Sequence, residues 1–154
     1  MKFSPALKHK IHALCNESVQ NKLNLIRQAI SDAREALTVE SKSSAGDKHE
    51  TARAMLQLET EKRSEQLVQA LNLQEMLYRI HLDEKSADNV HIGTLVHTSM
   101  GIFYISVGIG KLNYEDKEYM AISAASPIAS AMIGKQKGDS IEFNGKKIDI
   151  INVT

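Results

Sequence analysis

Residues that break helices are unevenly distributed along this chain of 154 residues. Residues 6–92 contain one glycine, Gly46, and no proline, whereas residues 93–154 contain seven glycines and Pro127. Glycine and proline are the residues least compatible with a helix interior, so only the first stretch can form long helices. That stretch is rich in helix-favouring residues, and the second is rich in Ile, Val and Tyr, which favour strands. The sequence therefore predicts an α+β protein.

Apolar residues in the first part follow a heptad pattern, which is typical of helices that pack along a seam. One run alternates spacings of four and three: Val19, Leu23, Ile26, Ile30, Ala33 and Leu37. A second run has spacings of three, four and three: Ala70, Leu73, Leu77 and Ile80. Continuing the second run backward puts Gln66, Arg63 and Glu59 on the seam, so we expect looser packing in that part.

The segment between the two heptad runs, residues 41–47, is polar and contains Gly46, which suits a turn. We therefore predict two helices, over about 6–40 and 48–82, that fold back on each other. Residues 1–82 would form an antiparallel coiled-coil hairpin with its tip at about 41–52.

The second part has the features of a small antiparallel sheet with one short helix. We predict strands over 90–97, 102–107 and 119–124. Ser126 and Pro127 are suited to open a helix that Gly134 closes. Asn144-Gly145 lies between two alternating segments and predicts a two-residue hairpin. Residues 90–154 would form this domain, joined to the hairpin by a hinge at 83–89.

The composition narrows the classes of function. Lys plus Arg and Asp plus Glu are both 19, so the net charge is zero and argues against a nucleic-acid coat or a membrane-surface protein. The single cysteine, Cys15, allows no internal disulfide and no cysteine-based zinc cluster, and we interpret it as an apolar filler. No apolar run is long enough for a membrane span or a signal peptide. We expect a soluble cytoplasmic protein without a membrane partner.

Motifs of common enzymes are incomplete in this chain. Gly110-Lys111 lacks the other residues of a phosphate loop, and Gly108-Ile109-Gly110 lacks the third glycine of a dinucleotide site. His9 and His12 share a helix face, but exposed histidines at this spacing are mostly solvated. The sequence therefore predicts a protein that is not an enzyme and has no cofactor of its own.

Two acids at the predicted tip remain to be explained. Asp47 and Glu50 are three residues apart at a helix start, so their carboxylates would point into one region. The same spacing also forms a capping box, in which each side chain accepts from the other's backbone amide. Both acids favour the positive end of the helix. On spacing alone the capping interpretation is favoured.

The chain resembles the Gre transcript-cleavage factors of bacterial RNA polymerase in two stretches. The first is Ala33-Arg34-Glu35 followed by the Gly46-Asp47-x-x-Glu50-x-Ala52 tip. The second, from Ile122 to Asp139, is similar to the family's Ile-Ser-x-x-Ser-Pro…Gly-Lys-x-x-Gly-Asp pattern. The resemblance covers essentially the whole chain. The chain departs from the family's pattern in two places. It has about nine extra residues within 36–45, and Arg53 follows the tip where the family has a different sequence.

The resemblance implies a transcription elongation factor, with the regulatory and DNA-binding associations of that family. Its hairpin would enter the polymerase secondary channel, and its second domain would be FKBP-like, docking at the rim without isomerase activity. Asp47 and Glu50 would be the catalytic and metal-binding residues, assisting the polymerase with a second Mg²⁺ shared by both proteins. The extruded RNA 3′ end would be an indirect partner, and we expect a monomer.

Two other interpretations remain open. Secondary-channel proteins can share the hairpin and acidic tip without promoting cleavage, and Arg53 could pair with Asp47 or Glu50 and weaken their hold on a metal. The hairpin could also be a coiled-coil interaction module unrelated to polymerase, because coiled coils commonly join proteins together.

Overall fold

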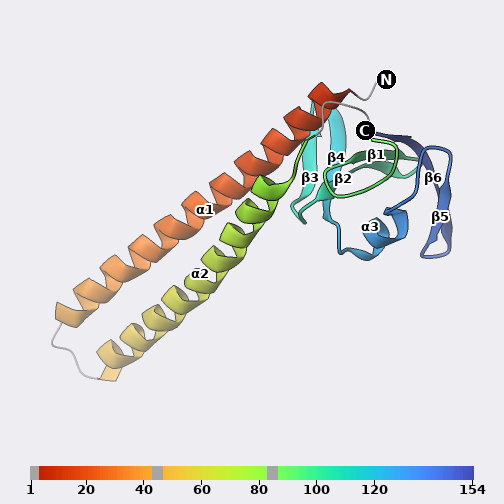
Figure 1. The fold of residues 1–154 in the computed structure, drawn as a ribbon. Helices are drawn as coiled ribbons and strands as arrows, with labels where there is room; N and C mark the ends of the chain where they lie inside the picture. Colours follow the sequence, from red (N-terminus) through yellow and green to blue (C-terminus); the bar gives the residue numbers. More distant parts are fainter. Residues whose placement is uncertain (1–3, 43–46, 83–86) are drawn as a thin grey trace. The chain divides into compact units, whose positions relative to one another are not determined.

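A computed structural model describes residues 4–42, 47–82 and 87–154, with side chains described outside 40–42 and 47–49 (Figure 1). Two long helices precede a six-stranded sheet and one short helix, which confirms the predicted α+β class. The chain divides into two compact units. One is Val19–Gln74, and the other combines Met1–Ser18 with Glu75–Thr154. Most of the predicted hinge, residues 83–86, lies outside the described residues.

The first unit is the helical hairpin. Helix α1 runs over Pro5–Lys42 and α2 over Asp47–Arg79, and Figure 1 shows them running in opposite directions. The predicted seam on α1 is confirmed up to Ala33, whereas its last predicted member, Leu37, is half-buried. No member of the confirmed set is more than 6% exposed: Val19, Leu23, Ile26, Ile30 and Ala33. Gln74 Nε2 donates to Gln20 Oε1 at 3.4 Å and joins the two helices across 54 positions.

The polar part of the α2 seam satisfies its own hydrogen bonds. Arg63 Nε donates to Glu59 Oε1 at 2.8 Å, and Arg63 Nη1 donates to Gln66 Oε1 at 3.1 Å. All three side chains are half-buried, whereas Ala70 and Leu77 of the same helix are fully buried. Partly exposed polar contacts stabilise a hairpin less than apolar burial does, so the looser packing predicted there has a structural basis.

The second unit contains the sheet, in the order β3-β4-β2-β1-β6-β5. Its strands are β1 (Leu95–Thr98), β2 (Gly101–Ser106), β3 (Gly110–Tyr114), β4 (Lys117–Ser123), β5 (Ser140–Phe143) and β6 (Lys146–Val153). Strands β2 and β4 pair in parallel and all other neighbours are antiparallel. The sheet is therefore mixed, and β3 is a strand that the sequence pattern did not predict.

The first predicted strand, 90–97, is shortened to β1 by a turn at its start. Thr94 Oγ1 donates to the His91 carbonyl at 2.6 Å, and Gly93 has a φ of +92°. A Cβ at Gly93 would lie 2.9 Å from Ile80 Cγ2, so only glycine fits this close approach of the backbone to Ile80. Because the chain at Gly93 packs closely against Ile80, just after the end of α2, β1 begins only at Leu95.

The predicted turns and the short helix α3 (Pro127–Met132) are confirmed. Ser126 Oγ accepts from the Ala129 amide at 3.3 Å, and Gly134 follows the helix with a φ of +85°. Asn144 and Gly145 have φ values of 53° and 75° between β5 and β6. Positive φ at both central residues is the backbone of the tight hairpin turn that Asn-Gly favours.

The two faces of the sheet have different packing. One face forms a core with α3, in which Val96, Ile105 and Ile148 are buried beside Met132. On the other face, the Tyr104 hydroxyl shares a hydrogen bond with His12 Nδ1 of α1 at 2.7 Å. The first turns of α1 therefore belong to the sheet unit. No helix in the described ranges has an apolar stretch that could span a bilayer.

Candidate functional site

The acidic tip lies at the start of α2. This helix begins at Asp47, and Glu50 lies in its first turn with an exposed side chain. The side chain of Asp47 and residues 43–46 lie outside the described residues, and so does the predicted capping box. The backbone nevertheless puts both acids in one helical turn at the end of the hairpin where α1 finishes.

Arg53 lies one turn beyond Glu50, and both side chains are exposed. Within the described residues these two side chains form no ion pair, although i,i+3 neighbours on a helix can reach each other. The pairing that would occupy the Glu50 carboxylate is therefore not formed between them. A pair between Arg53 and Asp47 would involve the Asp47 side chain, which lies outside the described residues.

The two acids at the tip would offer only carboxylate oxygens to a metal ion. Carboxylate oxygens are the ligands that Mg²⁺ prefers, and one or two of them commonly suffice when a partner supplies the rest. Over the described parts of the chain, no group of three or more His, Cys, Asp or Glu side chains could hold a metal ion. The Asp47 side chain lies outside those parts, so this finding does not concern the tip.

A basic groove accompanies the tip on the same hairpin, and sequence reasoning missed it. It encloses about 340 Å³ and is lined by Arg27, Ile30, Ser31 and Arg34 of α1 and by Ser64 and Leu67 of α2. Arg34 belongs to the Ala-Arg-Glu stretch, in which Ala33 is buried in the seam. No ion pair involves Arg27 or Arg34 within the described residues. Their spacing of seven places them on one helix face, which was the available signal.

The second family-like stretch has structural roles here. Ser126 and Ile133 cap α3, and the amide of the following Gly134 donates to the Val90 carbonyl at 2.8 Å. The aromatic residues of the domain are core or strand-surface residues, as the sequence indicated. Tyr104 and Tyr119 are buried, and three others are half-buried on strands: Phe103, Tyr114 and Phe143.

The geometry thus consists of a helical hairpin with carboxylates at its end, a pair of arginines along one side, and a small mixed sheet. No known protein-family model matches this chain, and no curated protein matches it.

Proposed function

We propose that this chain is an accessory factor of bacterial RNA polymerase that enters the secondary channel and stimulates cleavage of backtracked transcripts. The observation that supports this most is the hairpin itself, with Asp47 and Glu50 in the first turn of α2. From Val19 to Lys42, α1 extends for about 36 Å at about 1.5 Å per residue. A hairpin of that length could extend into a deep channel and place the carboxylates of its tip there.

The chemistry divides between the two proteins. Cleavage hydrolyses a phosphodiester bond near the RNA 3′ end, and the polymerase provides the catalytic centre. A Mg²⁺ ion shared with the polymerase would supply charge that activates water and stabilises the leaving oxygen. In this proposal Asp47 contributes a carboxylate ligand. Glu50, exposed and without an ion pair to Arg53, accepts a hydrogen bond from the attacking water and orients it.

The arginine groove gives the proposal a second, independent support. Arg27 and Arg34 present guanidinium groups beside the Ser31 hydroxyl, all of which can donate to phosphate oxygens, whereas the Ser64 hydroxyl already donates to the Thr60 carbonyl at 2.9 Å. Arg27 and Arg34 are free of carboxylate partners in the described parts, so their charge is available to an anionic ligand. In the proposed complex this side of the hairpin faces the backbone of the extruded RNA.

The test is transcript cleavage by a stalled, backtracked polymerase complex from the source organism, with Mg²⁺ present. The Asp47→Ala/Glu50→Ala variant is compared with Glu61→Ala/Glu65→Ala, which removes the same charge from exposed positions on α2. We expect the tip variant to lose stimulated cleavage and still co-purify with polymerase. The control variant should cleave as wild type does. Normal cleavage by the tip variant would contradict the assignment of these acids.

A cleavage-silent channel regulator is the second candidate, favoured by the positive charge of Arg53 one turn from Glu50. It predicts polymerase binding with no RNA fragments from wild-type protein. A coiled-coil module unrelated to polymerase predicts no binding and a concentration-dependent association through the seam. The same assay, run with co-purification and light scattering, separates the three functions.

A further inference from the structure

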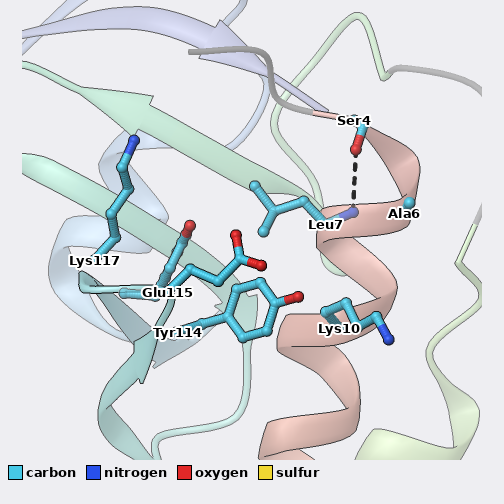
Figure 2. Close-up of a pocket in the computed structure, with 8 residues that line it drawn as sticks. Ser4, Ala6, Leu7, Lys10, Tyr114, Glu115 and Lys117 are labelled. Carbon is cyan, nitrogen blue, oxygen red and sulfur yellow. Dashed lines mark hydrogen bonds between the residues drawn. The ribbon is translucent and has the colours of Figure 1, made fainter.

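A second cavity lies within the sheet unit, on the side where α1 begins (Figure 2). It encloses about 340 Å³ between the first turns of α1 and the turn that joins β3 to β4. Ser4 and Leu7 line it from the helix, and Tyr114, Glu115 and Tyr119 line it from the sheet. Neither acid of the hairpin tip takes part in it, so any ligand here is separate from the proposed transcription function.

A carboxylate is directed into this cavity. In Figure 2 the Glu115 side chain extends from the turn toward α1, between Tyr114 and Leu7. Within the described residues Glu115 forms neither an ion pair nor a side-chain hydrogen bond. Its backbone has a φ of 47°, and that of Asp116 is 62°, conformations that side chains other than Asn, Asp and Gly adopt at a cost. The turn therefore holds Glu115 here against its local preference.

Tyr119 adds a hydroxyl to the polar lining. Tyr119 is 2% exposed, yet its hydroxyl has no hydrogen-bond partner among the described residues. Burial raises the pKa of Tyr119, and the nearby Glu115 carboxylate and Tyr114 raise it further, so the phenol stays protonated. A buried tyrosine normally finds a partner for its hydroxyl. Tyr119 lines the same cavity as Glu115, so a ligand bound there would be within reach of this hydroxyl.

The positive charges at the rim are directed elsewhere. Lys10 and Lys117 also line the cavity, but Figure 2 shows both ammonium groups pointing away from the Glu115 carboxylate. Apart from the lysines, the lining offers one carboxylate, hydroxyl groups on Ser4, Tyr114 and Tyr119, and the apolar Leu7 side chain.

We propose that this cavity binds the primary ammonium group of a small organic amine. An ammonium group has three donors and no acceptor, which matches the Glu115 carboxylate and the lone pairs of the Tyr119 hydroxyl. The Tyr114 ring attracts a cation through its π face, and Leu7 covers a short alkyl chain. An anion would instead be repelled by the Glu115 charge, and a neutral alcohol would lack the charge that pairs with this carboxylate.

The test uses the full chain and n-butylammonium as the probe, with 1-butanol and butyrate as neutral and anionic counterparts. Binding is followed by chemical shifts of backbone amides over residues 4–10 and 114–119. We expect saturable shifts with n-butylammonium at a Kd on the order of millimolar, as befits a fragment of this size. The two counterparts should bind at least about tenfold more weakly, because they lack the charge-assisted hydrogen bond.

Glu115→Gln should weaken n-butylammonium binding by about tenfold or more, and Tyr119→Phe by a few-fold, since each removes one acceptor. Asp116→Asn is the matched control, because it removes one charge from the same turn but not from the cavity lining. It should leave the affinity within about twofold, because exposed charges outside the site are screened. Amide spectra of each variant without ligand establish that it is folded.

Three results would overturn the proposal. One is the absence of saturable shifts with n-butylammonium at these residues. Another is an affinity for 1-butanol equal to that for n-butylammonium, which would show that the cavity recognises only the alkyl chain. The third is unchanged affinity in folded Glu115→Gln, which would show that the carboxylate does not recognise the amine. None of them bears on cleavage, so the proposed function is tested separately.

Discussion

At the scale of single residues, the contact of His12 with Tyr104 couples a titratable group to the sheet. The two rings meet edge to face with centroids 5.9 Å apart, and the hydroxyl lies 2.7 Å from Nδ1. Burial lowers the pKa of His12 below its ordinary value of 6.5, and the neighbouring His9 lowers it further. A hydrogen bond with the backbone of Leu77 opposes both effects. The folded protein therefore holds this imidazole neutral more strongly than the unfolded chain does.

This depressed pKa predicts a loss of stability in mild acid. As the pH falls below 6.5, the unfolded chain takes up a proton at His12 that the folded chain resists, so the free energy of unfolding decreases. The decrease ends once the pH is below the lowered folded pKa. Thermal unfolding between pH 5 and pH 8 measures this slope, and His12→Asn should make it shallower.

The control for that series is His81→Asn, because His81 is exposed. Some slope should remain in His12→Asn, because burial and then Lys117 also lower the pKa of His97. A slope in His12→Asn as steep as that of wild type would contradict the assignment to His12.

At the scale of secondary-structure elements, the chain contains two tight hairpin turns of like backbone and unlike sequence. Asn144-Gly145 has φ values of 53° and 75°, and Glu115-Asp116 has 47° and 62°. Each turn joins strands whose flanking residues pair directly, Phe143 with Lys146 and Tyr114 with Lys117. Asn-Gly is the preferred sequence for this turn, whereas glutamate resists positive φ.

Exchanging the turn sequences should therefore change stability in opposite directions. Replacing Glu115-Asp116 by Asn-Gly is expected to stabilise the protein by about 1 kcal/mol, because it relieves left-handed backbone strain. Replacing Asn144-Gly145 by Glu-Asp should destabilise it by a similar amount. Urea unfolding of both variants checks the pair. If the Asn-Gly replacement at residues 115 and 116 does not stabilise the protein, the backbone strain at these residues is negligible.

Elements with a local signal were predictable, and those that depend on distant packing were not. The heptads around Leu23 and the Asn144-Gly145 turn are encoded in a few neighbouring residues, and both were confirmed. Strand β3 was missed because it alternates exposed Lys111 and Asn113 and ends at a turn without glycine. The cavity at Tyr119 was also missed, because it requires the start of α1 to lie against a turn more than a hundred residues away.

At the scale of the whole molecule, the sheet unit is built from both ends of the chain. It combines residues 1–18 with residues 75–154, and the distal hairpin, Val19–Gln74, is inserted between them. Apolar side chains of the inserted segment, such as Leu23 and Ile30, are buried in the seam of the hairpin itself. The length of the hairpin can therefore be changed without altering the residues that form the sheet core.

That independence allows a direct test of whether the tip works by reach. Removing residues 20–26 and 68–74 takes one heptad from each helix within Val19–Gln74, keeps the seam in register and retains Arg27 and Arg34. The hairpin should shorten by about 10 Å at about 1.5 Å per residue. On the proposed function, this variant binds polymerase but no longer stimulates cleavage, because Asp47 and Glu50 stop short of the catalytic centre. Far-ultraviolet circular dichroism should show that the shortened protein keeps its α-helices. Full stimulation of cleavage by this folded variant would contradict the idea that the hairpin must be long enough to bring Asp47 and Glu50 to the catalytic centre.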